Sequence, residues 1–119
     1  MSKKILIAED EVAIASALEL KLQHSGFETV IAPDGEVAMT ELKAGKFDLV
    51  ILDLMMPKLD GFGVLEEMKK AGIHTPVIVA SNLSQPEDEK KAKDLGAKDF
   101  FVKSNVPLSD LVKKIEAHV

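Results

Sequence analysis

Five short apolar runs alternate with amphipathic stretches along the 119 residues of this chain. The runs predict strands, and the stretches, with apolar residues three and four positions apart, predict helices. Strands are expected near residues 4–9, 28–32, 47–53, 76–81 and 98–103. Helices are expected near residues 11–25, 35–44, 60–71, 84–95 and 107–118. Regular alternation with short connections predicts an α/β fold with parallel strands and right-handed crossovers.

The inner strands and the buried helix faces can also be predicted. Leu49–Leu52 and Val77–Ala80 are apolar without alternation, which is typical of strands covered by helices on both sides. Two helices carry apolar stripes that should face the core, Ile14, Leu18 and Leu22 in the first and Leu108, Leu111, Val112 and Ile115 in the last.

Glycine marks the predicted helix ends. Gly26, Gly45, Gly72 and Gly96 each follow a helix, where a left-handed residue is expected. Apolar residues that should contact the end of the helix follow three of them, namely Phe27, Ile73 and Ala97. The segment Ser84–Glu87 resembles a capping box with proline in the first turn.

Composition narrows the class of protein. No apolar run approaches the roughly 20 residues of a membrane span, and the start is too short for a secretory signal. The chain has no cysteine, and its net charge of −5 with lysine as the sole basic residue gives no basic face for nucleic acid. We therefore expect one cytoplasmic domain over residues 1–119, with no direct binding to nucleic acid or membrane.

Polar groups stand at four predicted strand ends. Glu9 and Asp10 follow the first strand, Asp53 the third, Ser81 ends the fourth and Lys103 ends the fifth. Because parallel strands deliver their carboxyl ends to one edge of the sheet, these groups should converge where such sheets bind ligands.

The types of residue predict a magnesium and phosphoryl site. Carboxylates held close together need compensation, which Mg²⁺ provides, with Asp10, Asp53 and the carbonyl of Met55 as expected ligands. Lys103 and Ser81 could bind phosphoryl oxygens. With no cysteine and no histidine near these strand ends, the expected nucleophile is the Asp53 carboxylate.

At these motifs the sequence resembles the receiver domains of two-component response regulators, which are CheY-like. The resemblance covers essentially the whole chain and rests on four segments: Ile5–Glu11, Asp48–Pro57 with Asp60-Gly61, Pro76–Ser81, and Phe100–Lys103. It implies a doubly wound five-stranded parallel sheet flanked by five helices, flavodoxin-like, with strand order 2-1-3-4-5.

The resemblance also implies functional roles for individual residues. Asp53 would accept phosphate from a phosphohistidine on a sensor histidine kinase or a histidine phosphotransfer protein. Glu9 would bind Mg²⁺ through water, Ser81 would be the switch hydroxyl and Phe100 the switch aromatic, with Lys103 beside the phosphate. The face of the fourth helix, fifth strand and fifth helix would pass the signal to an effector protein or a fused output domain.

Three positions bear on how this chain compares with the family that it resembles. The family usually has a cis proline after the lysine, whereas this chain has Ser104, where a cis bond costs about 3 kcal/mol. The residues that tune hydrolysis in the family are here Met55 and Leu83. Neither can orient a water, so we expect slow loss of phosphate.

Three alternatives stay open from the sequence. An aspartate-nucleophile phosphatase of the haloacid-dehalogenase kind would need a second acid where Met55 stands. An FMN-binding module would need a hydroxyl-rich loop where Glu9-Asp10-Glu11 stands. A receiver that acts only as a non-phosphorylated interaction module would not need the acidic residues and Lys103.

A free-standing regulator and the receiver part of a longer one fit the sequence equally.

Overall fold

The computed structural model describes residues 3–82, 85–103 and 107–119. Its strands are β1 (Lys4–Ala8), β2 (Glu28–Ala32), β3 (Leu49–Leu52), β4 (Val77–Ser81) and β5 (Asp99–Val102). Its helices are α1 (Val12–His24), α2 (Gly35–Ala44), α3 (Gly61–Ala71), α4 (Pro86–Asp94) and α5 (Leu108–His118). All ten elements begin and end within two residues of the predicted positions.

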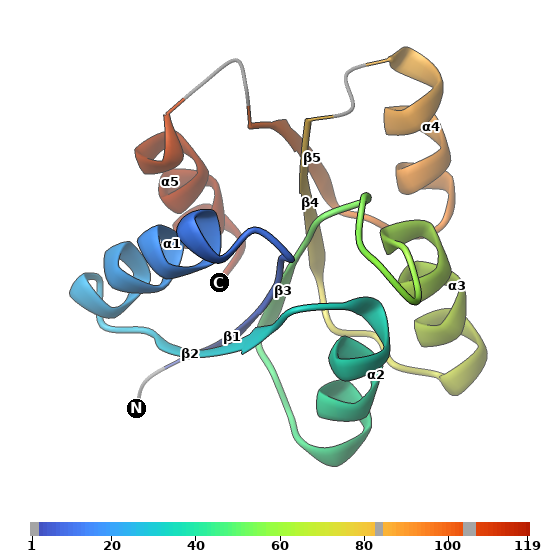
Figure 1. Cartoon of the computed structure of the whole chain (residues 1–119), viewed down its shortest axis with the longest axis horizontal. Coiled ribbons are helices and arrows are strands. Elements are labelled where there is room, and N and C mark those ends of the chain that lie inside the picture. Colours follow the sequence, from blue (N-terminus) through green and yellow to red (C-terminus); the bar gives the residue numbers. More distant parts are fainter. Residues whose placement is uncertain (1–2, 83–84, 104–106) are drawn as a thin grey trace.

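The five strands form one parallel sheet in the order β2-β1-β3-β4-β5. Helices α1 and α5 cover one face of the sheet, and α2, α3 and α4 cover the other (Figure 1). The predicted doubly wound α/β fold is therefore confirmed. Among the described residues, no helix has both the length and the apolar character that a bilayer crossing requires.

Two hydrophobic cores hold the sheet between its helical layers. Every residue of β3 and β4 is buried, and successive side chains enter opposite cores because strand side chains alternate. Thus Val50 packs toward α2, α3 and α4, whereas Ile51 packs toward α1 and α5. The predicted stripe of α1 needs a correction: Ile14 is only half-buried, and Ala15 is buried with Leu18 and Leu22 instead.

Three of the four predicted left-handed glycines are confirmed. Gly26, Gly72 and Gly96 have φ of 90°, 71° and 112°. In each case the amide of the residue that follows the glycine donates to a carbonyl five residues earlier, for example Phe27 N to Leu22 O at 3.0 Å. These bonds satisfy carbonyls that the helix leaves without a partner.

Two predictions about helix ends fare differently. The prediction for Gly45 is wrong: its φ is −144°, because the chain leaves α2 in an extended conformation that any residue can adopt. The predicted capping box falls partly outside the described residues, at Ser84; Gln85 precedes α4 and makes no side-chain capping bond.

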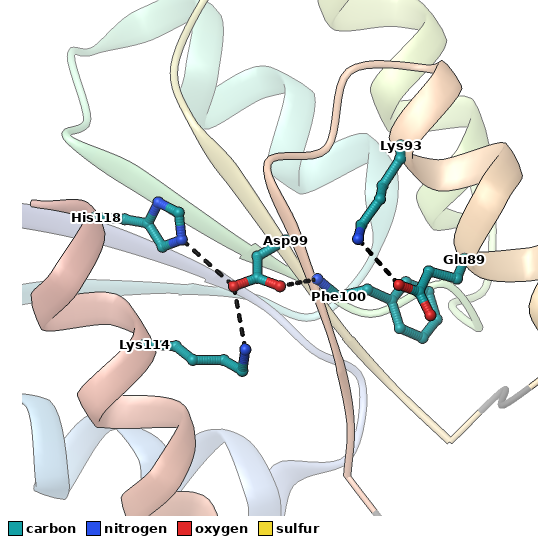
Figure 2. Close-up of polar contacts among 6 residues, drawn as sticks. All are labelled: Glu89, Lys93, Asp99, Phe100, Lys114 and His118. Atoms are coloured by element: carbon teal, nitrogen blue, oxygen red, sulfur yellow. Dashed lines mark hydrogen bonds and ion pairs between the residues drawn. The ribbon is translucent and has the colours of Figure 1, made fainter.

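Asp99 ties the edge strand β5 to the last helix. Its Oδ2 lies 3.1 Å from Lys114 Nζ and 3.4 Å from His118 Nε2, while Oδ1 accepts the Phe100 amide at 2.8 Å (Figure 2). Partial burial favours a higher pKa for this carboxyl group, but the hydrogen bonds from Phe100, Lys114 and His118 together hold its pKa below the usual range. The group therefore stabilises the fold in its charged form.

We expect Asp99→Asn to lower the free energy of unfolding at neutral pH by up to about 1 kcal/mol, the size typical of a partly exposed ion pair. The folded pKa lies below the unfolded one, so this stabilisation is present above the ordinary aspartate pKa and is lost as pH falls through the folded value. Urea unfolding of both proteins at neutral pH and below pH 3 measures the difference. Asp94→Asn, which removes an exposed partner of Lys90, is the control and should change little.

Candidate functional site

Three charged side chains meet at the carboxyl edge of the sheet. Glu9 follows β1, Asp53 follows β3 and Lys103 follows β5. Lys103 Nζ lies 2.5 Å from Glu9 Oε1 and 3.3 Å from Asp53 Oδ2. All three side chains are almost completely buried, at 5–6% exposure. The predicted convergence of groups far apart in the sequence is therefore observed for these three.

Backbone bonds continue the sheet past the strand ends and so fix the positions of these residues. Asp53 N donates to Ala8 O at 3.0 Å, and Glu9 N donates to Ala32 O at 3.0 Å. On the other side of the sheet, Lys103 N donates to Ser81 O at 2.9 Å. The site is thus built on residues that are hydrogen-bonded to the sheet rather than on free loops.

The Asp53 carboxylate has a defined orientation. One oxygen, Oδ2, contacts Lys103, and the other, Oδ1, accepts the Met55 amide at 3.1 Å. The Met55 side chain does not fill the site, since this residue is 58% exposed. Met55 therefore contributes backbone groups beside Asp53 and leaves its side chain toward solvent.

The buried cluster has more negative than positive charge. Burial raises the pKa of Glu9 to about 7, an effect that Lys103 opposes and the nearby Asp53 strengthens. Burial favours a lower pKa for Lys103, but the hydrogen bond to Glu9 and the charges of Asp53 and Glu9 raise it overall. The lysine thus stays charged, and one proton on Glu9 or one additional cation would balance the two carboxylates.

A metal ion would meet suitable ligands here. Glu9, Asp10 and Asp53 each offer a carboxylate oxygen, and these oxygens lie within 4.8 Å of one another. Asp10 is exposed, whereas the other two are buried, so an ion could approach from solvent on the Asp10 side. An all-oxygen donor set with excess negative charge fits Mg²⁺, which prefers such ligands and keeps several waters.

Ser81 and Phe100 lie close to this cluster on the sheet. Ser81 is completely buried at the end of β4 and pairs with Val102 of β5. Phe100 pairs with Val79, and since strand side chains alternate, Phe100 and Ser81 project to the same face. Phe101 packs in the opposite core.

The structure brings together most of the residues that the sequence singled out. Glu9, Asp10, Asp53 and Lys103 form one cluster, whereas Phe100 is a core residue behind it. Sequence reasoning placed Lys103 beside the phosphoryl group and missed Glu9 as its nearer partner. The sequence did contain a signal for this contact. Glu9 directly extends the buried run of β1, and a buried acid requires a partner.

Two of the sequence predictions fall outside the described residues. The peptide between Lys103 and Ser104, where the family usually has a cis proline, is one of them, and Leu83 is the other.

Comparison with known proteins points to one family. Residues 5–116 match the model of the response regulator receiver domain. The chain is 41% identical over 117 residues to the "probable transcriptional regulator ycf27" of Cyanophora paradoxa, covering 98% of this chain and 46% of that protein. It is 35% identical over 107 residues to the alkaline phosphatase synthesis transcriptional regulatory protein PhoP of Bacillus subtilis, covering 90% and 45%.

Solved structures agree with this assignment. The receiver domain of the Francisella response regulator 1452 superposes with a TM-score of 0.93 at 30% identity, covering 98% of this chain and 96% of that one. The response regulator TrrA of Thermotoga maritima, solved in complex with Mg²⁺-BeF, gives 0.86 at 31% identity, covering 98% and 99%.

The chain therefore belongs to the response regulator receiver domain family, whose members act as phosphorylation-activated signalling switches. It spans less than half the length of the curated regulators that it matches.

The charge balance of the cluster predicts an unusual pH dependence of stability. The folded pKa of Glu9, about 7, lies above its unfolded value, so the folded state binds more protons between about pH 4.5 and 7. Glu9 therefore destabilises the metal-free fold increasingly as pH rises through this window. Glu9→Gln keeps one of the two acceptor oxygens that serve the Glu11 amide and Lys103, and it removes the titrating group, so it should flatten this decline.

The measurement is urea unfolding of the wild type and Glu9→Gln in EDTA at pH 5, 6, 7 and 8. We expect the variant to gain stability relative to the wild type as pH rises. Glu11→Gln, a neighbouring exposed acid, should follow the wild type. Parallel pH profiles for the wild type and Glu9→Gln would rule out this account of the cluster.

Proposed function

We propose that Asp53 is the phosphoacceptor of this receiver domain, in a receiver unit formed by residues 1–119. The observation that carries the proposal is the environment of its carboxylate: buried, oriented by the Met55 amide, contacted by Lys103, and placed beside two further acids. A nucleophile held in this way needs little rearrangement before it reacts.

We propose that the cation of the site is Mg²⁺. Asp10 and Asp53 would be direct ligands, the Met55 carbonyl a third, and Glu9 would bind through water. The fit rests on the donor set and on the excess negative charge of the cluster. When bound, Mg²⁺ supplies positive charge that stabilises the phosphoryl oxygens during transfer.

Phosphoryl transfer would use the remaining residues of the site. An Asp53 carboxylate oxygen attacks phosphorus, a P–O bond forms, and the P–N bond of the donor phosphohistidine breaks as its imidazole leaves. Lys103 exchanges part of its contact with Asp53 for a contact with a phosphoryl oxygen. Ser81 donates its hydroxyl to another phosphoryl oxygen. The chain thus promotes its own phosphorylation rather than the turnover of a separate substrate.

The signal would leave through the sheet face that Ser81 and Phe100 share. Movement of Ser81 toward the phosphoryl group vacates space on this face, and Phe100, 9% exposed, can turn inward to fill it. Such a local charge event biases a two-state element. The surface formed by α4, β5 and α5 changes shape as a result, and it is the surface that an effector would read.

Partners follow from the proposed chemistry. The phosphoryl donor is a sensor histidine kinase or a histidine phosphotransfer protein in the cytoplasm. The output is an effector protein or a fused domain, and the relatives are transcriptional regulators. The domain itself presents an acidic chain of net charge −5, which does not favour direct binding to nucleic acid.

The alternative functions are less well supported. A haloacid-dehalogenase-like phosphatase needs a second acid two residues after the nucleophile, and Met55 occupies this position with its side chain in solvent. An interaction module without phosphorylation would not require two acids and a lysine to be buried together at a desolvation cost.

The acceptor can be tested directly with acetyl phosphate and Mg²⁺. Asp53→Asn should abolish labelling because an amide oxygen is a poor nucleophile, and intact-mass spectrometry should show no added phosphoryl group. Asp48→Asn is the matched control, since Asp48 precedes β3 and accepts the Lys4 amide at 2.7 Å, which asparagine can also do. Stoichiometric labelling of Asp53→Asn would place the nucleophile elsewhere.

We also expect the phosphorylated protein to lose phosphate slowly. The exposed thioether of Met55 cannot hold a water in line with the P–O bond. Mass spectrometry after removal of acetyl phosphate, with Mg²⁺ present, follows the decay. Met55→Asn, which adds a water-orienting amide, should shorten the half-life, whereas a half-life of seconds in the wild type would contradict the prediction.

A further inference from the structure

The segment that carries Asp53 runs from β3 to α3. It packs against Gly61 at the start of α3 and against Gly35 at the start of α2. On the α3 side, a Cβ at Gly61 would lie 2.7 Å from Leu54 Cα and closer still to the Asp53 carbonyl oxygen. The Gly61 amide also donates to Leu54 O at 3.0 Å. Leu54 and Asp53 therefore lie in direct backbone contact with the first residue of α3.

On the other side, the start of α2 touches the same segment. A Cβ at Gly35 would lie 2.7 Å from both the carbonyl carbon and the Cβ of Leu59, and closer still to its carbonyl oxygen. Because these are mainly backbone atoms, no rotamer change could make room. Any larger residue at position 35 must displace the segment itself.

The turn at Lys58 is held to α2 by charge as well. Lys58 has φ of 69°, the one left-handed non-glycine residue in the described part of the chain, and Leu59 N donates to Pro57 O at 2.8 Å across it. Lys58 Nζ lies 3.7 Å from Asp34 Oδ2. Asp34 is buried at 6% exposure and its Oδ1 accepts the Val37 amide at 2.8 Å, so it joins the turn to the first turn of α2.

We propose that Asp34 and Gly35, here called the α2 clamp, are positioning residues that fix Asp53 and Met55 through the backbone of Lys58 and Leu59. The inference rests on the proposed magnesium and phosphoryl-acceptor function of Asp53. The α2 clamp touches neither the metal ligands nor Lys103; it sets the path of the chain between Asp53 and α3. Mg²⁺ demands near-ideal ligand geometry, so a displaced Met55 carbonyl weakens its binding.

Gly35→Ala tests the clamp, and the chain offers two matched controls. Gly45→Ala makes the same change at the other end of α2, where φ is −144° and the new Cβ meets Glu41 O at an ordinary 3.8 Å. Gly72→Ala strains a left-handed residue with open space around it, and so lowers stability far from the site. It separates general destabilisation from a change at Asp53.

Two readouts on the whole chain decide the outcome. The first is the ¹H–¹⁵N resonance of the Met55 amide without metal, which reports its bond to Asp53 Oδ1. The second is the dissociation constant for Mg²⁺ from NMR titration. Gly35→Ala should shift the Met55 resonance and weaken Mg²⁺ binding by about tenfold, the lower end of the loss typical when a residue that supports a metal ligand is changed. Both controls should keep the wild-type resonance and affinity.

An unshifted Met55 amide with wild-type Mg²⁺ affinity in Gly35→Ala would overturn the inference and leave the proposed function intact. If the wild type itself bound no Mg²⁺, the proposed function would fail, and the Met55 resonance in metal-free protein would still decide the clamp. If Gly35→Ala does not fold, Asp34→Asn takes its place, because asparagine caps α2 equally well but loses the charge facing Lys58. A Met55 resonance unchanged in Asp34→Asn would then overturn the inference.

Discussion

The contacts of Lys103 with Glu9 and Asp53 join three strand ends that are 44 to 94 residues apart in the sequence. One ammonium group faces two carboxylates, and all three side chains are buried, so the cluster has a surplus of negative charge. Stability alone does not explain why these groups are buried together, because the desolvation of buried charges can cost more than their pairing returns. Such an arrangement is expected of a site that binds and releases a cation and a phosphoryl group.

The parallel sheet is what makes this cluster possible. Register places Ala8 beside Leu52 and Val79 beside Phe100, so the residues that follow the strands emerge side by side at one edge. The two cores on either side keep the sheet rigid, and hydrogen bonds continue it to Glu9, Asp53 and Lys103. Charged groups can therefore be held close together by apolar packing rather than by their own attraction.

The rest of the molecule connects this edge of the sheet to the helices on either side. The segment after Asp53 is confined between α2 and α3 by close backbone contacts at Gly35 and Gly61. The opposite side of the site leads through Ser81 to the strand that carries Phe100 and Asp99, and Asp99 joins this strand to α5 (Figure 2). One side thus confines the segment that follows Asp53, and the other connects the site to α5.

The sequence by itself determined the order and type of the elements, the parallel sheet and the residues at the strand ends, since each follows from local periodicity and from where apolar runs stop. It failed at Gly45 and Ile14, where the path of the chain or a neighbouring residue decided the outcome. Only the tertiary structure decided that Lys103 lies nearer to Glu9 than to Asp53, that Glu9 has a raised pKa, and that Gly35 packs on Leu59. These are distances and burial between residues remote in the sequence, which periodicity does not encode.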